Sequence, residues 1–172
     1  MKKSKYLILV IIGMLTLVTL AGCGSKSNEN KVVQSTSNIE SEKFEMKYEN
    51  IEITPGMVFD KNKLNEEVKV SEIPSCAFDG TDNVYTLSNL EITVANIDGE
   101  DRVYSVYFLD DEVETNEGVK ITDSKQKMID KYGNNYEQRL GNQFTYTKGN
   151  VELTFIIENE IITSIEYTLK TN

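Results

Sequence analysis

The sequence predicts an α+β protein in which two tandem units, each a helix followed by a three-stranded antiparallel meander, form one two-layer domain. Two pairs of similar segments predict the duplication. Residues 85–94 match 146–155 at an offset of 61, and residues 103–108 match 162–167 at an offset of 59. A weaker match joins 55–59 to 117–121. Alternating apolar and polar residues predict the strands, and apolar residues three to four apart predict the helices.

The second unit, about residues 115–172, shows these patterns most clearly. Its helix is expected to follow Asp123 as N-cap, to carry Met128 and Tyr132 on one face, and to end at Gly133. Strands are expected around 144–146, over 151–157 and over 161–169. These elements follow one another as helix and then meander.

The first unit, about residues 50–114, repeats the plan. Asp60 is expected to cap a helix that carries Leu64 and Val68, and strands are expected near 84–88, 90–96 and 103–109. One such unit buries too little surface to be stable alone. We therefore expect the two units to share one sheet within a globular domain of residues 48–172, with helices on one face and the other face open.

The N-terminus carries an export signal. Residues 1–5 include three lysines, and the apolar run 6–20 is too short to span a bilayer, so residues 1–22 are interpreted as a signal peptide. Leu20-Ala21-Gly22-Cys23 resembles the lipobox of bacterial lipoproteins. The resemblance implies cleavage before Cys23, a diacylglyceryl group on its thiol, and anchoring at the extracytoplasmic face of the cell membrane. The polar residues 23–47 are then a flexible tether. A transmembrane anchor or a plain secretory signal is the alternative.

Charge and composition exclude several functions. The chain has a formal charge of −10, which becomes −13 when residues 1–22 are removed, so nucleic acid is not expected as a partner. It contains no His, which removes the commonest general base and every His-containing metal site. No nucleotide-binding or nucleophile motif is present. We expect no catalytic residues, no cofactor and no metal.

Three segments carry groups with alternative roles. Cys76 would be the only cysteine left besides the lipidated one, and we interpret it as a small buried packing residue rather than a reactive thiol. Acidic residues cluster at 98–101 and 110–114. Their oxygens are ligands that Ca²⁺ accepts, but solvated turns are the preferred interpretation because Asp98-Gly99 is a common hairpin dipeptide.

Two wider resemblances concern the globular domain. The plan of two helix-plus-meander units resembles the fold of the secreted β-lactamase inhibitory protein, and each unit looks like the small lipoprotein of the outer-membrane barrel-assembly machine. Residues 74–80, 103–107, 115–119 and 130–133 are similar to a group of uncharacterised lipoproteins of Gram-positive bacteria. That similarity covers about residues 50–170 and implies fold and location only.

A comparison of the two units indicates a binding face. In the last strand of each unit, the residues opposite the core stripe are expected to be Ile162, Ser164, Glu166 and Thr168 in the second unit and Val103, Ser105, Tyr107 and Leu109 in the first. The first unit thus has Tyr for Glu and Leu for Thr, and Tyr is enriched at interfaces. Val103, Tyr107 and Leu109 form the candidate binding face, unless a neighbouring segment covers them as a second small core.

The function expected from these observations is non-catalytic. The chain is predicted to be a lipid-anchored module that binds a protein or another envelope component, with the membrane contacted through the lipid on Cys23. A structural or assembly accessory of the envelope is the first alternative. An enzyme acting on envelope polymers is the weaker alternative, because no catalytic motif supports it.

Overall fold

The structure is a computed structural model that describes residues 43–64 and 67–171. The predicted signal peptide, the predicted lipidation site Cys23 and the tether up to residue 42 lie outside the described residues. Of the described residues, 51% are in strands and 9% in helices. The predicted α+β class is therefore wrong. The fold is mostly β, with one α-helix in the described part and no pair of helix-plus-meander units.

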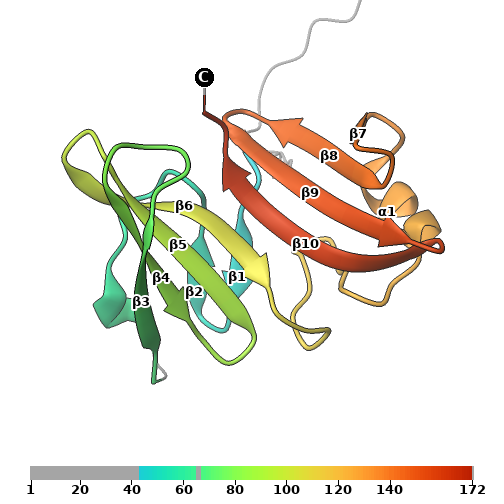
Figure 1. Ribbon diagram of the computed structural model, residues 1–172. Helices are drawn as coiled ribbons and strands as arrows, with labels where there is room; N and C mark the ends of the chain where they lie inside the picture. The colour runs from blue at the N-terminus through green and yellow to red at the C-terminus, as the bar shows by residue number, and fades with distance from the viewer. Residues whose placement is uncertain (1–42, 65–66, 172) are drawn as a thin grey trace, which may run out of the picture. The chain divides into compact units, whose positions relative to one another are not determined.

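Eight antiparallel strands form the main sheet (Figure 1). They span Lys69–Pro74 (β3), Thr81–Thr86 (β4), Leu90–Ile97 (β5), Glu100–Phe108 (β6), Glu137–Arg139 (β7), Gln143–Lys148 (β8), Val151–Glu158 (β9) and Ile161–Leu169 (β10). Their order in the sheet is β3-β4-β5-β6-β10-β9-β8-β7. Each half of the sheet has four strands, and β6 and β10 join the halves in the middle, where Tyr107 pairs with Glu166.

The outer strand of each half is missing from the sequence prediction. All six residues of β3 are exposed, and β7 has only three residues, so neither strand shows an apolar stripe. Backbone pairing to β4 and to β8 holds these strands in place instead. The prediction also lacks a separate hairpin, which consists of β1 (Met46–Tyr48) and β2 (Ile51–Ile53).

The helix predicted after Asp60 is a single 3-10 turn, η1 (Lys61–Lys63). Its cap is as expected, because the Asp60 carboxylate accepts a hydrogen bond from the Asn62 amide at 3.0 Å. None of the residues of η1 is buried. Without an apolar face against the sheet, so short a helix gains too little to extend.

The helix predicted in the second half is confirmed as α1 (Lys125–Tyr132), with a different cap. Ser124 is the N-cap, and its hydroxyl accepts a hydrogen bond from the Lys127 amide at 3.2 Å. Gly133 follows the helix at φ 81°, a conformation that glycine adopts without strain. Met128 is fully buried against the sheet.

A β-bulge interrupts each of the two central strands. In β6, Thr93 pairs with Ser105 and Val94 with Val103, which leaves Tyr104 without a partner. In β10, the pairing likewise skips Thr163. An extra residue reverses the side-chain alternation on one side of the bulge. Simple alternation therefore predicts the wrong face of the sheet for the residues on the N-terminal side of the bulge in both strands.

Each central strand keeps its hairpin partner along one edge, β5 for β6 and β9 for β10, but changes its neighbour along the other edge at the bulge. Before the bulge in β6, Val103 exchanges backbone hydrogen bonds with Gly56 and Met57. Before the bulge in β10, Ile162 accepts a hydrogen bond from the Thr122 amide and donates one to the Asp123 carbonyl. After the bulges, β6 and β10 pair with each other. Residues 56–57 and 122–123 thus pair with β6 and β10 through equivalent backbone hydrogen bonds.

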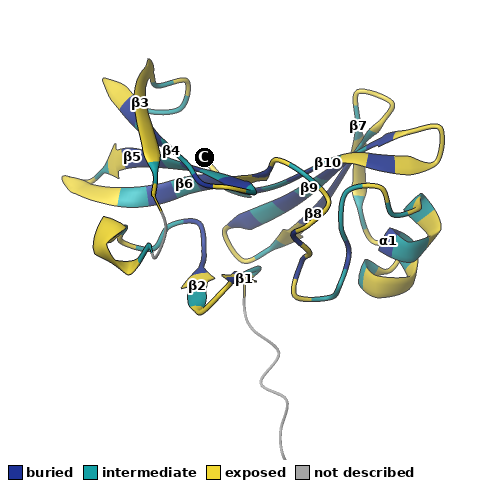
Figure 2. Ribbon diagram, turned by 90° about the horizontal axis from the view of Figure 1, so that it is seen from below, coloured by how far each residue is buried: buried dark blue, intermediate teal, exposed yellow. Residues whose placement is uncertain are grey.

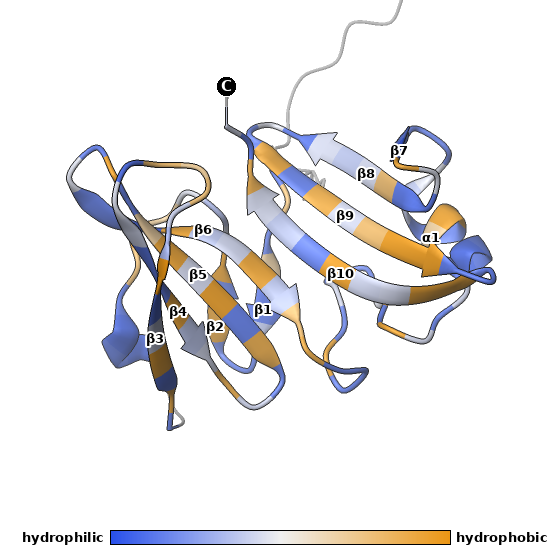
Figure 3. Ribbon diagram, viewed as in Figure 1, coloured by the Kyte–Doolittle hydropathy of each residue, from blue (hydrophilic) through white to orange (hydrophobic). Residues whose placement is uncertain are grey.

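The core lies on one face of the sheet, where the β1–β2 hairpin and α1 cover it (Figure 2). Hydrophobic and hydrophilic residues alternate along most of β5 and β9 (Figure 3), and the side chains on the core face are buried, namely Leu90, Ile92 and Val94 in β5 and Val151, Leu153, Phe155 and Ile157 in β9. The largest fully buried side chains include Tyr167, Phe108 and Phe155. Met46 is also fully buried, so the packed domain begins within the segment predicted as tether.

Candidate functional site

The face of the main sheet opposite the core, which we call the open face, holds most of the predicted binding residues. Cross-strand pairing places Glu91 of β5 and Glu166 of β10 on either side of Tyr107 in β6. Directly paired residues point to the same face, with Cβ atoms about 5 Å apart. Tyr107 is 37% exposed, and Leu109 just beyond the strand is 41% exposed. These two side chains form an apolar patch beside two carboxylates.

Val103, the third residue of the predicted binding face, lies in the core instead. Its side chain is 1% exposed and points to the same face as that of its partner Val94. The bulge at Tyr104 is the cause. Its extra residue shifts the side-chain alternation, so Val103 points to the core although Tyr107 points to the open face. The bulge at Thr163 has the same effect on Ile162, which is fully buried rather than outward-facing.

The two carboxylates beside Tyr107 have no counter-ion. None of the ion pairs within residues 43–64 and 67–171 includes Glu91 or Glu166. Burial raises the pKa of Glu166, a hydrogen bond with Ser105 opposes the rise, and the negative charge of Glu91 adds to it. Glu166 is therefore a half-buried acid that interacts unfavourably with Glu91 across the tyrosine.

A second aromatic contact on the open face is absent from the sequence prediction. Tyr104 meets Phe78 of the β3–β4 loop edge to face, with 5.5 Å between the ring centroids. Burial and the charges of Glu166 and Asp82 raise the pKa of Tyr104, which places its hydroxyl near both acids. The sequence signal for this loop is Ser75, a residue type that favours turns. In the structure its hydroxyl accepts a hydrogen bond from the Phe78 amide at 3.0 Å.

Asp82 adds a buried acid to the same region. It is 3% exposed, and its Oδ1 atom has no hydrogen-bond partner within the described part of the chain. A buried polar atom without a partner costs about 1–3 kcal/mol. Asp82 therefore places a carboxyl group near Tyr104 at the expense of folding stability.

Cys76 lies in the β3–β4 loop and is exposed, so the prediction that it packs in the core is wrong. The loop connects the outermost strand β3 to β4, and its residues Cys76, Asp79 and Gly80 are exposed. A cysteine at this place has no core to enter, which alternation within a strand cannot reveal.

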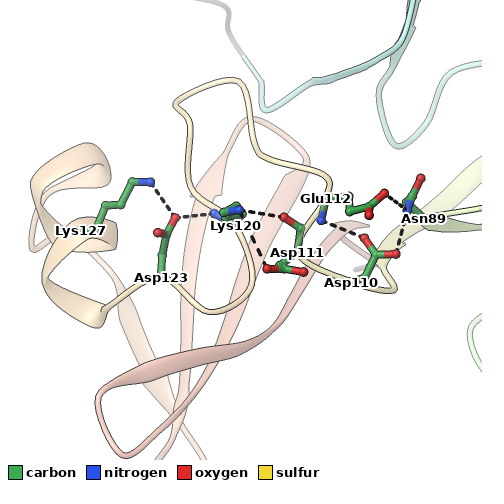
Figure 4. A network of polar contacts seen from close by, with 7 residues as sticks. All are labelled: Asn89, Asp110, Asp111, Glu112, Lys120, Asp123 and Lys127. Atoms are coloured by element: carbon green, nitrogen blue, oxygen red, sulfur yellow. Dashed lines mark hydrogen bonds and ion pairs between the residues drawn. The ribbon is translucent and has the colours of Figure 1, made fainter.

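The acidic segment 110–114 holds two loops together (Figure 4). The Asn89 side chain donates a hydrogen bond to Asp110 at 2.7 Å, and Asp110 also accepts one from the Glu112 amide. Lys120 donates to the backbone carbonyl of Asp111 at 3.0 Å. In the other acidic segment, Asp98 and Gly99 have positive φ and form the two-residue turn between β5 and β6. Both segments thus shape turns.

The same network reaches the start of α1 through Asp123 (Figure 4). Its carboxylate accepts hydrogen bonds from the Lys120 amide and from the Lys127 side chain, both at 2.8 Å. Burial opposes ionisation, but these two bonds prevail and lower the pKa of Asp123. Asp123 is therefore a structural anion at the helix start, although it is not the N-cap.

Two hollows lie elsewhere on the described surface. One of about 520 Å³ is lined by residues of the β2 region, namely Asn50, Ile51, Glu52, Met57 and Lys63. Another of about 340 Å³ includes Phe44, Lys131, Tyr132 and Glu117. There the Tyr132 hydroxyl donates a hydrogen bond to Glu117, and burial strongly raises the pKa of Tyr132. Tyr132 therefore remains a hydrogen-bond donor that fixes the 115–119 loop, rather than a base.

No helix among the described residues is long and apolar enough to cross a membrane. No group of three or more Cys, Asp and Glu side chains within these ranges has the geometry to hold a metal ion.

Comparison of the chain with protein-family models, with curated proteins and with solved structures finds no match. The candidate site therefore rests on the chain's own geometry, and consists of Tyr107, Leu109, Glu91 and Glu166 on the open face.

Proposed function

We propose that this chain is a non-catalytic lipoprotein of the bacterial envelope, anchored through Cys23 at the extracytoplasmic face of the membrane, that binds a protein partner through its open face. The observation that carries the binding role is the exposed pair Tyr107 and Leu109 on the open face. Tyrosine contributes a large contact area and a polar tip at a low cost in side-chain entropy.

The surroundings of Tyr107 support recognition rather than packing. The neighbouring positions of the open face on β9 and β10 are Thr154 and Thr168, which suit a solvated sheet surface. The hydrophobic core cluster lies on the opposite face of the sheet. Tyr107 therefore lies among threonines and glutamates at the surface, where packing of the core does not require a tyrosine and a partner can reach its ring.

Lipid anchoring is tested with Cys23→Ser in the full-length chain. A serine hydroxyl is a much poorer nucleophile than a thiolate, so lipid attachment should be abolished. Partitioning into the detergent phase and the mass of the processed N-terminus measure the effect. A variant that is still processed and still partitions with lipid would contradict the anchor.

Partner binding is tested by placing a photo-crosslinking amino acid at position 109 of the full-length chain in its native cells. A discrete crosslinked protein is expected, and the Tyr107→Thr change should reduce its yield at least fivefold. Leu140 is the matched control position, because it is 91% exposed and lies on the β7–β8 connection. The same products from both positions, or none from position 109, would contradict binding through the open face.

The edge strand β3 favours an assembly accessory as the second candidate function. Val70 and Ile73 are 53% and 42% exposed, and no other strand of the described sheet pairs with the outer edge of β3. Such an edge accepts a further strand by backbone hydrogen bonding. Crosslinks from position 70 but not from position 109 would favour this alternative.

A further inference from the structure

We propose, on the basis of the function proposed above, that the partner is basic and docks an arginine side chain on the ring of Tyr107, between Glu91 and Glu166. The proposal commits the open face to one chemistry, a guanidinium held by an aromatic ring and two carboxylates. It concerns the partner's charge, whereas the proposed function concerns only whether a protein binds there.

The register of the sheet gives this site its dimensions. Neighbouring strands lie about 4.8 Å apart, so the backbones of Glu91 and Glu166 are about 10 Å apart with Tyr107 midway. A guanidinium stacks on an aromatic ring when it lies within about 6 Å of the ring centroid. From there, its planar fork of N–H donors points outward towards carboxylates on both sides.

Charge complementarity selects a cation as the occupant. Glu91 and Glu166 have no ion pair in the described part of the chain, and Asp82 adds a buried acid to the same face. Burial and Glu91 already disfavour the charged form of Glu166. A carboxylate that has lost part of its hydration gains more from a counter-ion than a fully solvated one does.

The chain's own arginines are engaged elsewhere. Arg139 binds Glu137 at 2.6 Å and Glu152 at 3.0 Å. Arg102 donates to the Gly56 carbonyl at 2.7 Å and also pairs with Glu100. These are the only arginines in the sequence. A guanidinium on Tyr107 must therefore come from another molecule.

The apolar residues beside the site favour a protein as the source of the cation. Leu109 is exposed next to Tyr107, and Tyr104 with Phe78 extends the aromatic surface of the open face. A partner can cover these residues with its own apolar side chains and so exclude water from the ion pairs. Exclusion of water strengthens both the cation–π contact and the charged hydrogen bonds.

The test titrates the full-length protein in non-ionic detergent micelles with two capped pentapeptides. One carries arginine at its centre between glycines and serines, and the other carries citrulline, its neutral isostere. ¹⁵N-tyrosine labelling reports on Tyr107, whose signal is assigned with Tyr107→Phe. We expect the arginine peptide to shift this signal, and the citrulline peptide to bind at least tenfold more weakly.

The matched variants change the same number of charges at two places. Glu91→Gln with Glu166→Gln should weaken binding of the arginine peptide at least tenfold. Glu158→Gln with Glu160→Gln, at the exposed β9–β10 turn, should leave it within twofold. Unchanged signals of the other tyrosines serve as the check on folding. No binding to the wild type, equal binding of the two peptides, or equal effects of the two variants would overturn the proposal.

The crosslinking experiment separates this proposal from the function on which it rests. The Glu91→Gln and Glu166→Gln variant should lower the crosslink yield at position 109 at least fivefold relative to the turn variant. An unchanged yield would overturn the basic partner but leave binding at the open face intact. A wild type that forms no crosslink would overturn the proposed function, while the peptide titration would still decide whether the site binds guanidinium.

Discussion

The two halves of the sheet share a hydrogen-bonding plan but place their aromatic residues on different faces. In the second half, Tyr132, Tyr136, Tyr146, Phe144 and Phe155 pack together on the core face under α1. In the described part of the first half, Phe59 contacts Tyr85 on the core face and Phe108 meets Tyr167 of the second half, whereas Tyr104, Phe78 and Tyr107 lie on the open face. The same backbone plan therefore supports a half with a large aromatic core cluster and a half with aromatic residues left on the open face, where we propose that a partner binds.

The largest expected effect tests the bulge that both halves contain. Ile162→Asp puts a charge at a position with no exposure, and should lower the free energy of unfolding by about 5 kcal/mol or prevent folding. Ile161→Asp is the control, because Ile161 is 42% exposed, and its effect should be within about 0.5 kcal/mol. Urea denaturation of the two variants measures both. Similar effects at the two positions would contradict the bulge at Thr163.

The bulges explain which parts of the fold the sequence could not predict. Alternation in β5, β8 and β9 predicts their core faces correctly, because each of these strands keeps one phase. In β6 and β10 the phase changes at Tyr104 and Thr163. Neither bulge has a glycine to mark it, and at each bulge the strand exchanges one edge neighbour for another. That exchange depends on residues far away in the sequence.

The second prediction asks whether the aromatic cluster stabilises the whole sheet or only its own half. Phe155→Ala removes a fully buried ring that contacts Tyr132 and Tyr146, and should cost about 3–5 kcal/mol. Val94→Ala, at the matching position of β5, removes fewer atoms and should cost less. Because β6 and β10 join the halves, calorimetry should show one transition for both variants. Two resolved transitions would mean that the halves unfold separately.

The third prediction concerns the segment that each half attaches before its bulge. Asp123 and Met57 accept equivalent backbone hydrogen bonds, from Ile162 and Val103, but only Asp123 carries a charge. Asp123→Asn should cost about 1–2 kcal/mol at pH 7, because it weakens the bonds from Lys120 and Lys127. Urea denaturation across a range of pH measures this cost.

The pH dependence of that cost has a definite sign. The pKa of Asp123 is lowered on folding, so its stabilisation is present above the unfolded-state pKa of about 3.9 and is lost as the pH falls through the folded-state value. The difference between wild type and Asp123→Asn should therefore shrink in acid. The effect of Met57→Leu should not change with pH. A cost of Asp123→Asn that stays constant down to pH 2 would contradict the charge as its cause.

The candidate site was predictable only where side-chain direction follows from local sequence. Tyr107 and Leu109 lie on the C-terminal side of the bulge, where alternation holds, and both are exposed. Val103 lies on the other side and is buried. The position of Glu91 beside Tyr107 depends on the register of β5 with β6, and that of Glu166 on the junction of the halves. Pairing across the junction leaves no local pattern in the sequence.

The smallest expected effect compares a tyrosine that occurs at the same place in both halves. Tyr146 of β8 donates a hydrogen bond to the Gly133 carbonyl at 2.7 Å, at the end of α1. Its counterpart Tyr85 in β4 packs on Phe59, and its hydroxyl has no hydrogen bond to another described residue. Tyr146→Phe should therefore cost about 1 kcal/mol, whereas Tyr85→Phe should change stability by less than about 0.5 kcal/mol.

Urea denaturation of the two single variants and the double variant measures this difference. The two hydroxyls lie in different halves and share no partner, so their effects should add to within about 0.5 kcal/mol. Equal costs at both positions would mean that the hydroxyl of Tyr146 does not hold α1 on the sheet. The second half would then owe its extra stability to the packing of its rings alone, and the helix would be a passive cover rather than a bonded part of the core.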